Sequence, residues 1–111
     1  MDKQKLQDLL LDGEIKEFNN LVESNNGDVD LSGLRLRSID LRKITFKDLN
    51  LEGAYLRASD LRGLDLSKAN LKHASIKDAK IAGVLFPSNI DPEEIMLSLI
   101  YGTRLRAKEL N

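Results

Sequence analysis

Residues 29–88 fall into twelve consecutive units of five residues: VDLSG, LRLRS, IDLRK, ITFKD, LNLEG, AYLRA, SDLRG, LDLSK, ANLKH, ASIKD, AKIAG and VLFPS. The third position of every unit is large and apolar: Leu31, Leu36, Leu41, Phe46, Leu51, Leu56, Leu61, Leu66, Leu71, Ile76, Ile81 and Phe86. The first position is apolar or small, and the other three are almost entirely charged, polar or glycine. A period of five matches neither a helix nor one long strand. It predicts short extended pieces joined by corners, four to a coil of twenty residues.

The units resemble the pentapeptide repeat family, whose signature is Ala-(Asp/Asn)-Leu-x-x. ANLKH at 69–73 matches that signature, and SDLRG at 59–63 differs from it by one residue. EFN at 17–19 followed by DLSG at 30–33 is similar to a leader seen in some family members. The resemblance implies a right-handed, four-sided β-helix with twenty residues in each coil.

We therefore expect an all-β solenoid core, a right-handed quadrilateral β-helix of three coils, capped by short helices at both ends. The expected parts are an N-terminal helical cap (1–28), the twelve repeats (29–88), and a C-terminal capping helix and tail (89–111). Residues twenty apart should stack at the strand spacing of roughly 4.8 Å. The expected interior columns are Leu31–Leu51–Leu71, Leu36–Leu56–Ile76, Leu41–Leu61–Ile81 and Phe46–Leu66–Phe86.

Short amphipathic helices are predicted on both flanks of the repeats. Apolar spacing indicates helices over 2–12, with Asp2 as N-cap, and over 14–24. Their apolar faces need a surface, and the first coil, with bulky first positions, is the expected one. Asp91 and Glu94 predict a capping box for a third helix over 92–101. Residues 103–111 are expected to be frayed.

The composition narrows the class of protein. Charged residues make up 32% of the 111 residues, yet the net charge is −1. That balance argues against a basic DNA-coating protein and against an acidic mimic of nucleic acid. The chain has no cysteine, and its start does not fit a signal peptide. We expect a cytoplasmic protein without a membrane span.

Catalysis is not expected, and neither is a cofactor or a metal site. The single histidine, His73, falls at an outward corner without an acid–base partner. Asp40 and Asp60 should stack like a carboxylate dyad, but arginines two residues on make ion pairing the better interpretation. A side-chain ladder and two ion pairs between coils are also predicted: Asp30–Asn50–Asn70, Glu52–Lys72 and Asp60–Lys80.

Two adjacent sides of the coils should be basic. The candidate residues for contact with an anionic partner are Arg35, Arg37, Arg42, Arg57, Arg62, Lys77 and Lys80, with Lys43 beside them. A solvated positive face is the simpler interpretation, and an anionic partner is the alternative. Nucleic acid is disfavoured, because three coils span only about 15 Å and no aromatic platform is interleaved.

The third predicted helix carries more apolar residues than one contact requires. The candidate interface consists of Ile95, Met96, Leu97, Leu99, Ile100 and Tyr101. One face can cover the last coil, and the other could join a homodimer or another protein. The resemblance supports a dimer, since some family members pair through the C-terminal coil.

These observations favour a non-catalytic protein-binding or scaffold module with an unidentified protein partner. The alternative, implied by one branch of the resembling family, is a DNA-mimic modulator of a type II topoisomerase (gyrase). The short length and the basic faces speak against that alternative. A third interpretation is a stable module without a specific partner.

Overall fold

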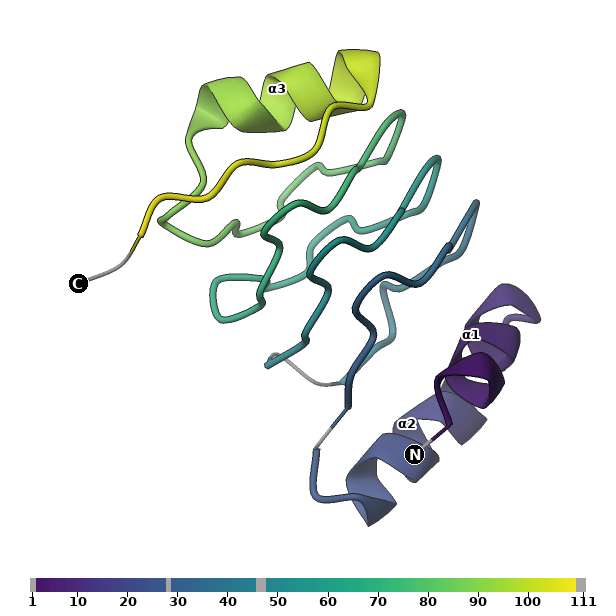
Figure 1. Ribbon diagram of the computed structural model, residues 1–111. Helices are drawn as coiled ribbons and strands as arrows, with labels where there is room; N and C mark the ends of the chain where they lie inside the picture. Colours follow the sequence, from purple (N-terminus) through teal and green to yellow (C-terminus); the bar gives the residue numbers. More distant parts are fainter. Residues whose placement is uncertain (1, 28, 46–47, 110–111) are drawn as a thin grey trace.

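The computed structural model describes residues 2–27, 29–45 and 48–109. Within them the chain forms three helices, α1 (Lys3–Leu11), α2 (Ile15–Ser24) and α3 (Pro92–Tyr101). Helices α1 and α2 pack together at one end of a coiled middle region, and α3 lies across the other end (Figure 1). None of the helices in the described part is long and apolar enough to cross a membrane.

The middle region consists of three stacked coils, which we number coil one (29–48), coil two (49–68) and coil three (69–88). Seven parallel β-bridges join residues twenty apart: Asp30–Asn50, Arg35–Tyr55, Asp40–Asp60, Asn50–Asn70, Tyr55–Ser75, Asp60–Lys80 and Asp65–Leu85. Backbone hydrogen bonds also connect neighbouring coils. The Leu31 amide donates to the Asn50 carbonyl at 2.9 Å, and the Tyr55 amide donates to the Leu34 carbonyl at 2.8 Å. The twenty-residue register predicted from the repeats is thus confirmed.

The prediction of an all-β solenoid core is wrong. Every bridge in the described part is isolated, so no strand and no sheet forms there, and helices are the regular elements. The reason is the frequency of the corners. Ser38, Ala58 and His73 all adopt left-handed backbone, with φ between 56° and 63°. A corner in each unit of five leaves too few extended residues for a strand, which usually needs three or more.

The interior is built from the third positions of the units. Nine of them are almost completely buried: Leu31, Leu36, Leu41, Leu51, Leu56, Leu61, Leu66, Leu71 and Ile76. Ile81 and Phe86, in the last coil, are half-buried and pack against this cluster. Phe46 was predicted in the same interior and lies outside the described residues.

Helices α1 and α2 cover the open end of coil one. The spacing of their apolar residues places Leu6, Leu10, Phe18 and Val22 in the same core as the coil leucines. Polar contacts fasten the helices as well, since Lys3 Nζ donates to the Ser32 carbonyl at 2.9 Å. The predicted cap of the first helix is confirmed, because the Asp2 side chain accepts from the Gln4 amide at 2.9 Å.

Helix α3 begins and ends where the sequence predicts, but its capping differs. The Asp91 side chain makes no capping hydrogen bond, so the predicted capping box does not form. Glu94 turns to the C-terminal tail instead, where it meets Arg106. At the other end Gly102 stops the helix with φ 73°. A Cβ there would lie 3.1 Å from Lys77 Cδ, so glycine also allows the close approach to coil three.

Candidate functional site

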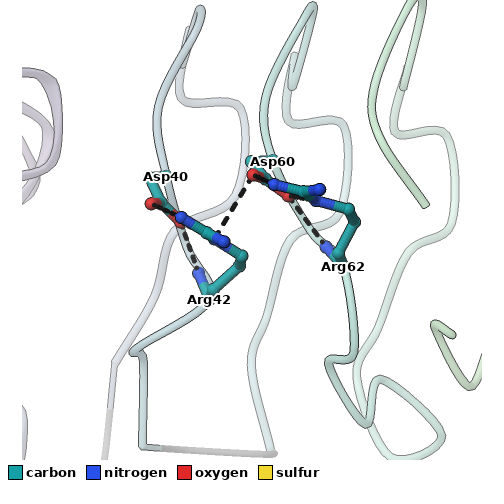
Figure 2. A network of polar contacts seen from close by, with 4 residues as sticks. All are labelled: Asp40, Arg42, Asp60 and Arg62. Atoms are coloured by element: carbon teal, nitrogen blue, oxygen red, sulfur yellow. Dashed lines mark hydrogen bonds and ion pairs between the residues drawn. The ribbon is translucent and has the colours of Figure 1, made fainter. Parts of the chain in front are cut away.

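Two aspartates and two arginines form a polar network on the outside of coils one and two (Figure 2). Asp40 Oδ2 accepts from Arg42 Nη2 at 2.8 Å, and Asp60 Oδ2 accepts from Arg62 Nη2 at 2.7 Å. Arg42 Nε also reaches across the coils to Asp60 Oδ2 at 3.3 Å. The predicted ion pairing of the stacked aspartates is therefore confirmed.

Both carboxylates of this network are held in the ionised form. Hydrogen bonds from the Arg42 side chain lower the pKa of Asp40 to about 2. Hydrogen bonds from the Arg62 side chain lower the pKa of Asp60 further below its usual range, against the opposing effect of its burial. A general acid or base works best with a pKa near the working pH, so this pair is unsuited to that role.

The aspartates of the network also shape the backbone. In six units the Asp or Asn side chain at the second position accepts a hydrogen bond from the amide two residues on, at 2.9 to 3.2 Å: Asp30, Asp40, Asn50, Asp60, Asp65 and Asn70. Such bonds pre-form a turn by replacing a backbone partner with a side chain. The second position therefore helps to build the corners of the coils.

One side of the coils lacks these carboxyl and amide groups. It consists of the units 34–38, 54–58 and 74–78, whose second positions hold Arg35, Tyr55 and Ser75. Their fourth positions hold the stacked residues Arg37, Arg57 and Lys77. The same three units contain one carboxylate, Asp78, at a corner. This side is therefore strongly positive.

Arg104 from the C-terminal tail joins this side of the coils. Its guanidinium carbon lies 4.7 Å from the centre of the Tyr55 ring, and that of Arg35 lies 5.5 Å from the same centre. Arg104 also donates to the Tyr55 hydroxyl and, at 3.0 Å, to the His73 carbonyl. Cation–π contacts of this kind hold both arginines against the tyrosine. We define the basic surface as the five cations on this side of the coils: Arg35, Arg37, Arg57, Lys77 and Arg104.

Comparison with known families decides the class of the chain. The sequence model described as pentapeptide repeats matches in eight copies, over residues 27–63 and 50–86, which together cover more than half of the chain. The chain belongs to the pentapeptide repeat family. A comparison with curated proteins and one with solved structures each found no match. The turns at the second positions give a physical reason for the Asp or Asn of the pentapeptide repeat signature.

The pentapeptide repeat coils divide the predicted basic residues into separate groups. Arg42 and Arg62 are ion-paired, whereas Arg35, Arg37, Arg57 and Lys77 belong to the basic surface. Lys80 lies above Asp60, to which it is joined by a backbone bridge. In the described part, neither of the predicted ion pairs Asp60–Lys80 and Glu52–Lys72 forms. Asp60 pairs with Arg42 and Arg62 instead of Lys80. Of the predicted ladder, the bond from Asn50 Nδ2 to Asp30 Oδ1 is present at 3.3 Å.

The C-terminal tail of this pentapeptide repeat protein was expected to be frayed, and that expectation is wrong for residues 103–109. The buried Leu105 exchanges backbone hydrogen bonds with coil three, donating to the Ala74 carbonyl and accepting from the His73 amide. Glu94 accepts from the Arg106 amide at 2.9 Å and pairs with its guanidinium at 2.6 Å. The segment TRLRA at 103–107 alternates like the unit LRLRS. That likeness was the sequence signal that could have placed Leu105 and Arg104.

The six predicted interface residues of α3 separate into two sets. Ile95 and Leu99 are half-buried against the pentapeptide repeat core. The others face outward, with exposed fractions of 53% for Met96, 38% for Leu97, 53% for Ile100 and 69% for Tyr101. Pro92, Glu93 and three of these outward residues line a shallow depression of about 450 Å³. Helix α3 therefore covers coil three and presents an apolar surface on its other side.

Proposed function

We propose that the chain is a non-catalytic protein-binding module and that it docks its partner on the outward face of α3. The coil region supports a repeat-protein module through the family match. The observation that carries the proposal is the apolar outer face of α3, defined by Met96, Leu97, Ile100 and Tyr101. Scattered exposed apolar residues are ordinary, but a contiguous set marks a surface for another protein.

Burial of the outward α3 face by a partner would be favourable in free energy. Burying one large apolar side chain contributes roughly 1.5–3 kcal/mol, so four partly exposed ones offer several kcal/mol to a partner. Tyr101 adds a phenol that can pack and hydrogen-bond at an interface. The non-catalytic part of the proposal is supported by the Asp40–Asp60 network, whose carboxylates stay ionised and paired. DNA mimicry draws no support, because it needs an acidic face where the coils present the basic surface.

A charge on the α3 face tests the proposal. We would compare the full chain with Ile100→Glu, and use Leu85→Glu as the matched control. Leu85 has a similar exposed fraction, 59%, but lies on coil three, outside α3. Proteins captured from the source cell by immobilised wild type would be identified, purified and titrated against each variant. We expect Ile100→Glu to weaken the reconstituted complex at least about tenfold, a loss of ~1.4 kcal/mol, and Leu85→Glu to leave it unchanged.

Sedimentation velocity over a range of concentrations gives the second readout. A wild-type dimer that Ile100→Glu dissociates would assign the α3 face to a second copy of the chain instead of another protein. Identical sedimentation and identical partner affinities for wild type and Ile100→Glu would contradict a docking role for this face.

A further inference from the structure

We propose that the basic surface binds a short acidic segment of another protein. The basic surface lies on the side of the coils and is separate from the outward face of α3. The proposal therefore names the chemistry of a second contact and does not depend on the docking role of α3.

The first argument is that the cations of the basic surface have no acidic partner among the described residues. In the part of the chain that the structure describes, none of the five takes part in an ion pair. On the neighbouring side, by contrast, Arg42 and Arg62 each meet an aspartate at 2.8 Å or less. The same fold thus neutralises its arginines on one side and leaves them available on the next.

The second argument is the energetic cost of this arrangement. Arg37, Arg57 and Lys77 occupy equivalent positions of three successive coils, so like charges stack in register, which is mildly destabilising. An Asp in the second position would offset the charge, and either Asp or Asn there would add a turn-forming hydrogen bond, as in six other units. These second positions hold Arg35, Tyr55 and Ser75 instead. An anionic partner would relieve the repulsion.

The third argument is that several of the cations are already held in place. Tyr55 stacks against both Arg35 and Arg104, and the His73 carbonyl accepts from Arg104. The stem of Lys77 lies against Gly102 at the end of α3. Binding then costs less side-chain entropy than it would for free surface chains. Guanidinium groups held in this way suit bidentate contact with carboxylates.

The shape of the surface indicates a small anionic segment. Arg35, Leu36, Arg37, Tyr55 and Arg57 line a depression of about 370 Å³ between coils one and two. The column from Arg37 to Lys77 spans two coil steps, roughly 10 Å at the spacing of parallel bridges. An extended peptide covers that length in about three residues. The expected ligand therefore carries two or three carboxylates within about four residues.

Nucleic acid fits the same surface less well. Single strands are held by bases stacked on free aromatic rings, and the Tyr55 ring is already occupied by two guanidinium groups. Affinity for a nucleic-acid backbone also grows with the number of phosphates neutralised, and three coils reach few of them. An acidic peptide needs neither a free ring nor a long track.

Fluorescence anisotropy with a synthetic peptide tests the proposal on the full chain. The probe is a fluorescein-labelled, end-capped peptide with three glutamates within four residues, and the competitor is a ten-residue oligothymidylate. We expect Arg37→Gln/Arg57→Gln to weaken peptide binding at least tenfold and Arg57→Gln alone to weaken it about threefold. The matched control, Arg42→Gln/Arg62→Gln, removes the same charge from the paired network and should change the affinity less than twofold.

Three results would overturn this inference: no peptide binding by the wild type, equal losses in the two double variants, or tighter binding of the oligothymidylate. Circular dichroism confirms that each variant is folded, which is expected because Arg37 and Arg57 are exposed. Ile100→Glu should leave peptide binding unchanged. A result that contradicts the proposal for the basic surface can therefore be told apart from one that contradicts the proposal for the α3 face.

Discussion

At the scale of single residues, the second position of each five-residue unit has two tasks. Where it is Asp or Asn, the side chain forms a turn with its own backbone, and in Asp40 and Asp60 it also binds arginine. Where it is Arg35 or Tyr55, the turn-forming side-chain bond is absent, and these two residues stack on each other and on Arg104 instead. The residue type at the second position therefore distinguishes the paired side of the coils, with Asp40 and Asp60, from the basic surface.

Lowering the pH should reveal how much the ionised Asp60 carboxylate contributes to the stability of the fold. Its pKa in the folded chain is lower than the ordinary value of about 3.9, so the ionised carboxylate stabilises the fold above pH ~4–5. That stabilisation is lost as the pH falls from there towards 2. We expect Asp60→Asn to melt below wild type at pH 7, and the difference to shrink by at least half near pH 2.

Thermal melts followed by circular dichroism across this range measure the effect. Asp48→Asn, which changes an exposed carboxylate outside the network, is the control and should follow the wild type. A difference between Asp60→Asn and wild type that does not vary with pH would contradict the role assigned to the ion pairs.

At the scale of elements, the C-terminal tail and α3 work as one unit. The tail returns along coil three, where Leu105 is buried, and Glu94 joins it to the helix through Arg106. Ser98 adds a buried contact, since its hydroxyl accepts from the Ile76 amide at 3.0 Å. The tail brings Arg104 to Tyr55, so the same contacts that close the core also complete the basic surface.

Breaking the contact between Glu94 and Arg106 should release the tail without unfolding the coils. We expect Glu94→Ala to raise the hydrogen-exchange rate of the Leu105 amide at least about tenfold while the Leu56 amide stays protected. Glu93→Ala, one residue earlier and exposed, is the matched control. Exchange resolved by mass spectrometry or NMR measures both sites, and unchanged protection of Leu105 in Glu94→Ala would show that the Glu94–Arg106 contact does not hold the tail.

At the scale of the whole molecule, the helices and coils share one hydrophobic core. Phe18 and Val22 of α2 belong to the same buried cluster as the coil leucines and Leu105 of the tail. Three coils alone leave both end layers open to water, and the helices close them. The chain should therefore unfold as one cooperative unit.

A cavity between α2 and coil one tests this cooperativity. Phe18 is fully buried, so Phe18→Ala should lower the free energy of unfolding by about 3–5 kcal/mol. In urea, helical dichroism and tyrosine fluorescence should shift together, with fluorescence measured in a Tyr101→Phe background so that it reports Tyr55 in the coils. The control is Leu11→Ala on α1, where the side chain is 45% exposed and the loss should stay below about 1 kcal/mol. Separate transitions for the two probes would mean that the helices and coils unfold independently.

Much of the architecture follows from the sequence alone. Twelve apolar third positions in fixed phase predict that residues twenty apart stack, and the parallel bridges have this register. Asp2, Pro92 and Gly102 mark helix ends through local chemistry that involves only neighbouring residues. The paired charges of Asp40 with Arg42 were also predictable, since two residues on one face of an extended unit lie within reach of each other.

Tertiary structure decided the remainder. Corners in each unit kept the bridges isolated, so the predicted β-solenoid core did not form strands. Glu94 bound Arg106 instead of capping its own helix, and Arg104 reached Tyr55, a residue 49 positions away. Asp60 bound two arginines and left Lys80 without the predicted partner. The three side-chain contacts share one physical reason: local periodicity sets which residues face inward, whereas competition among long side chains is resolved only when distant segments meet.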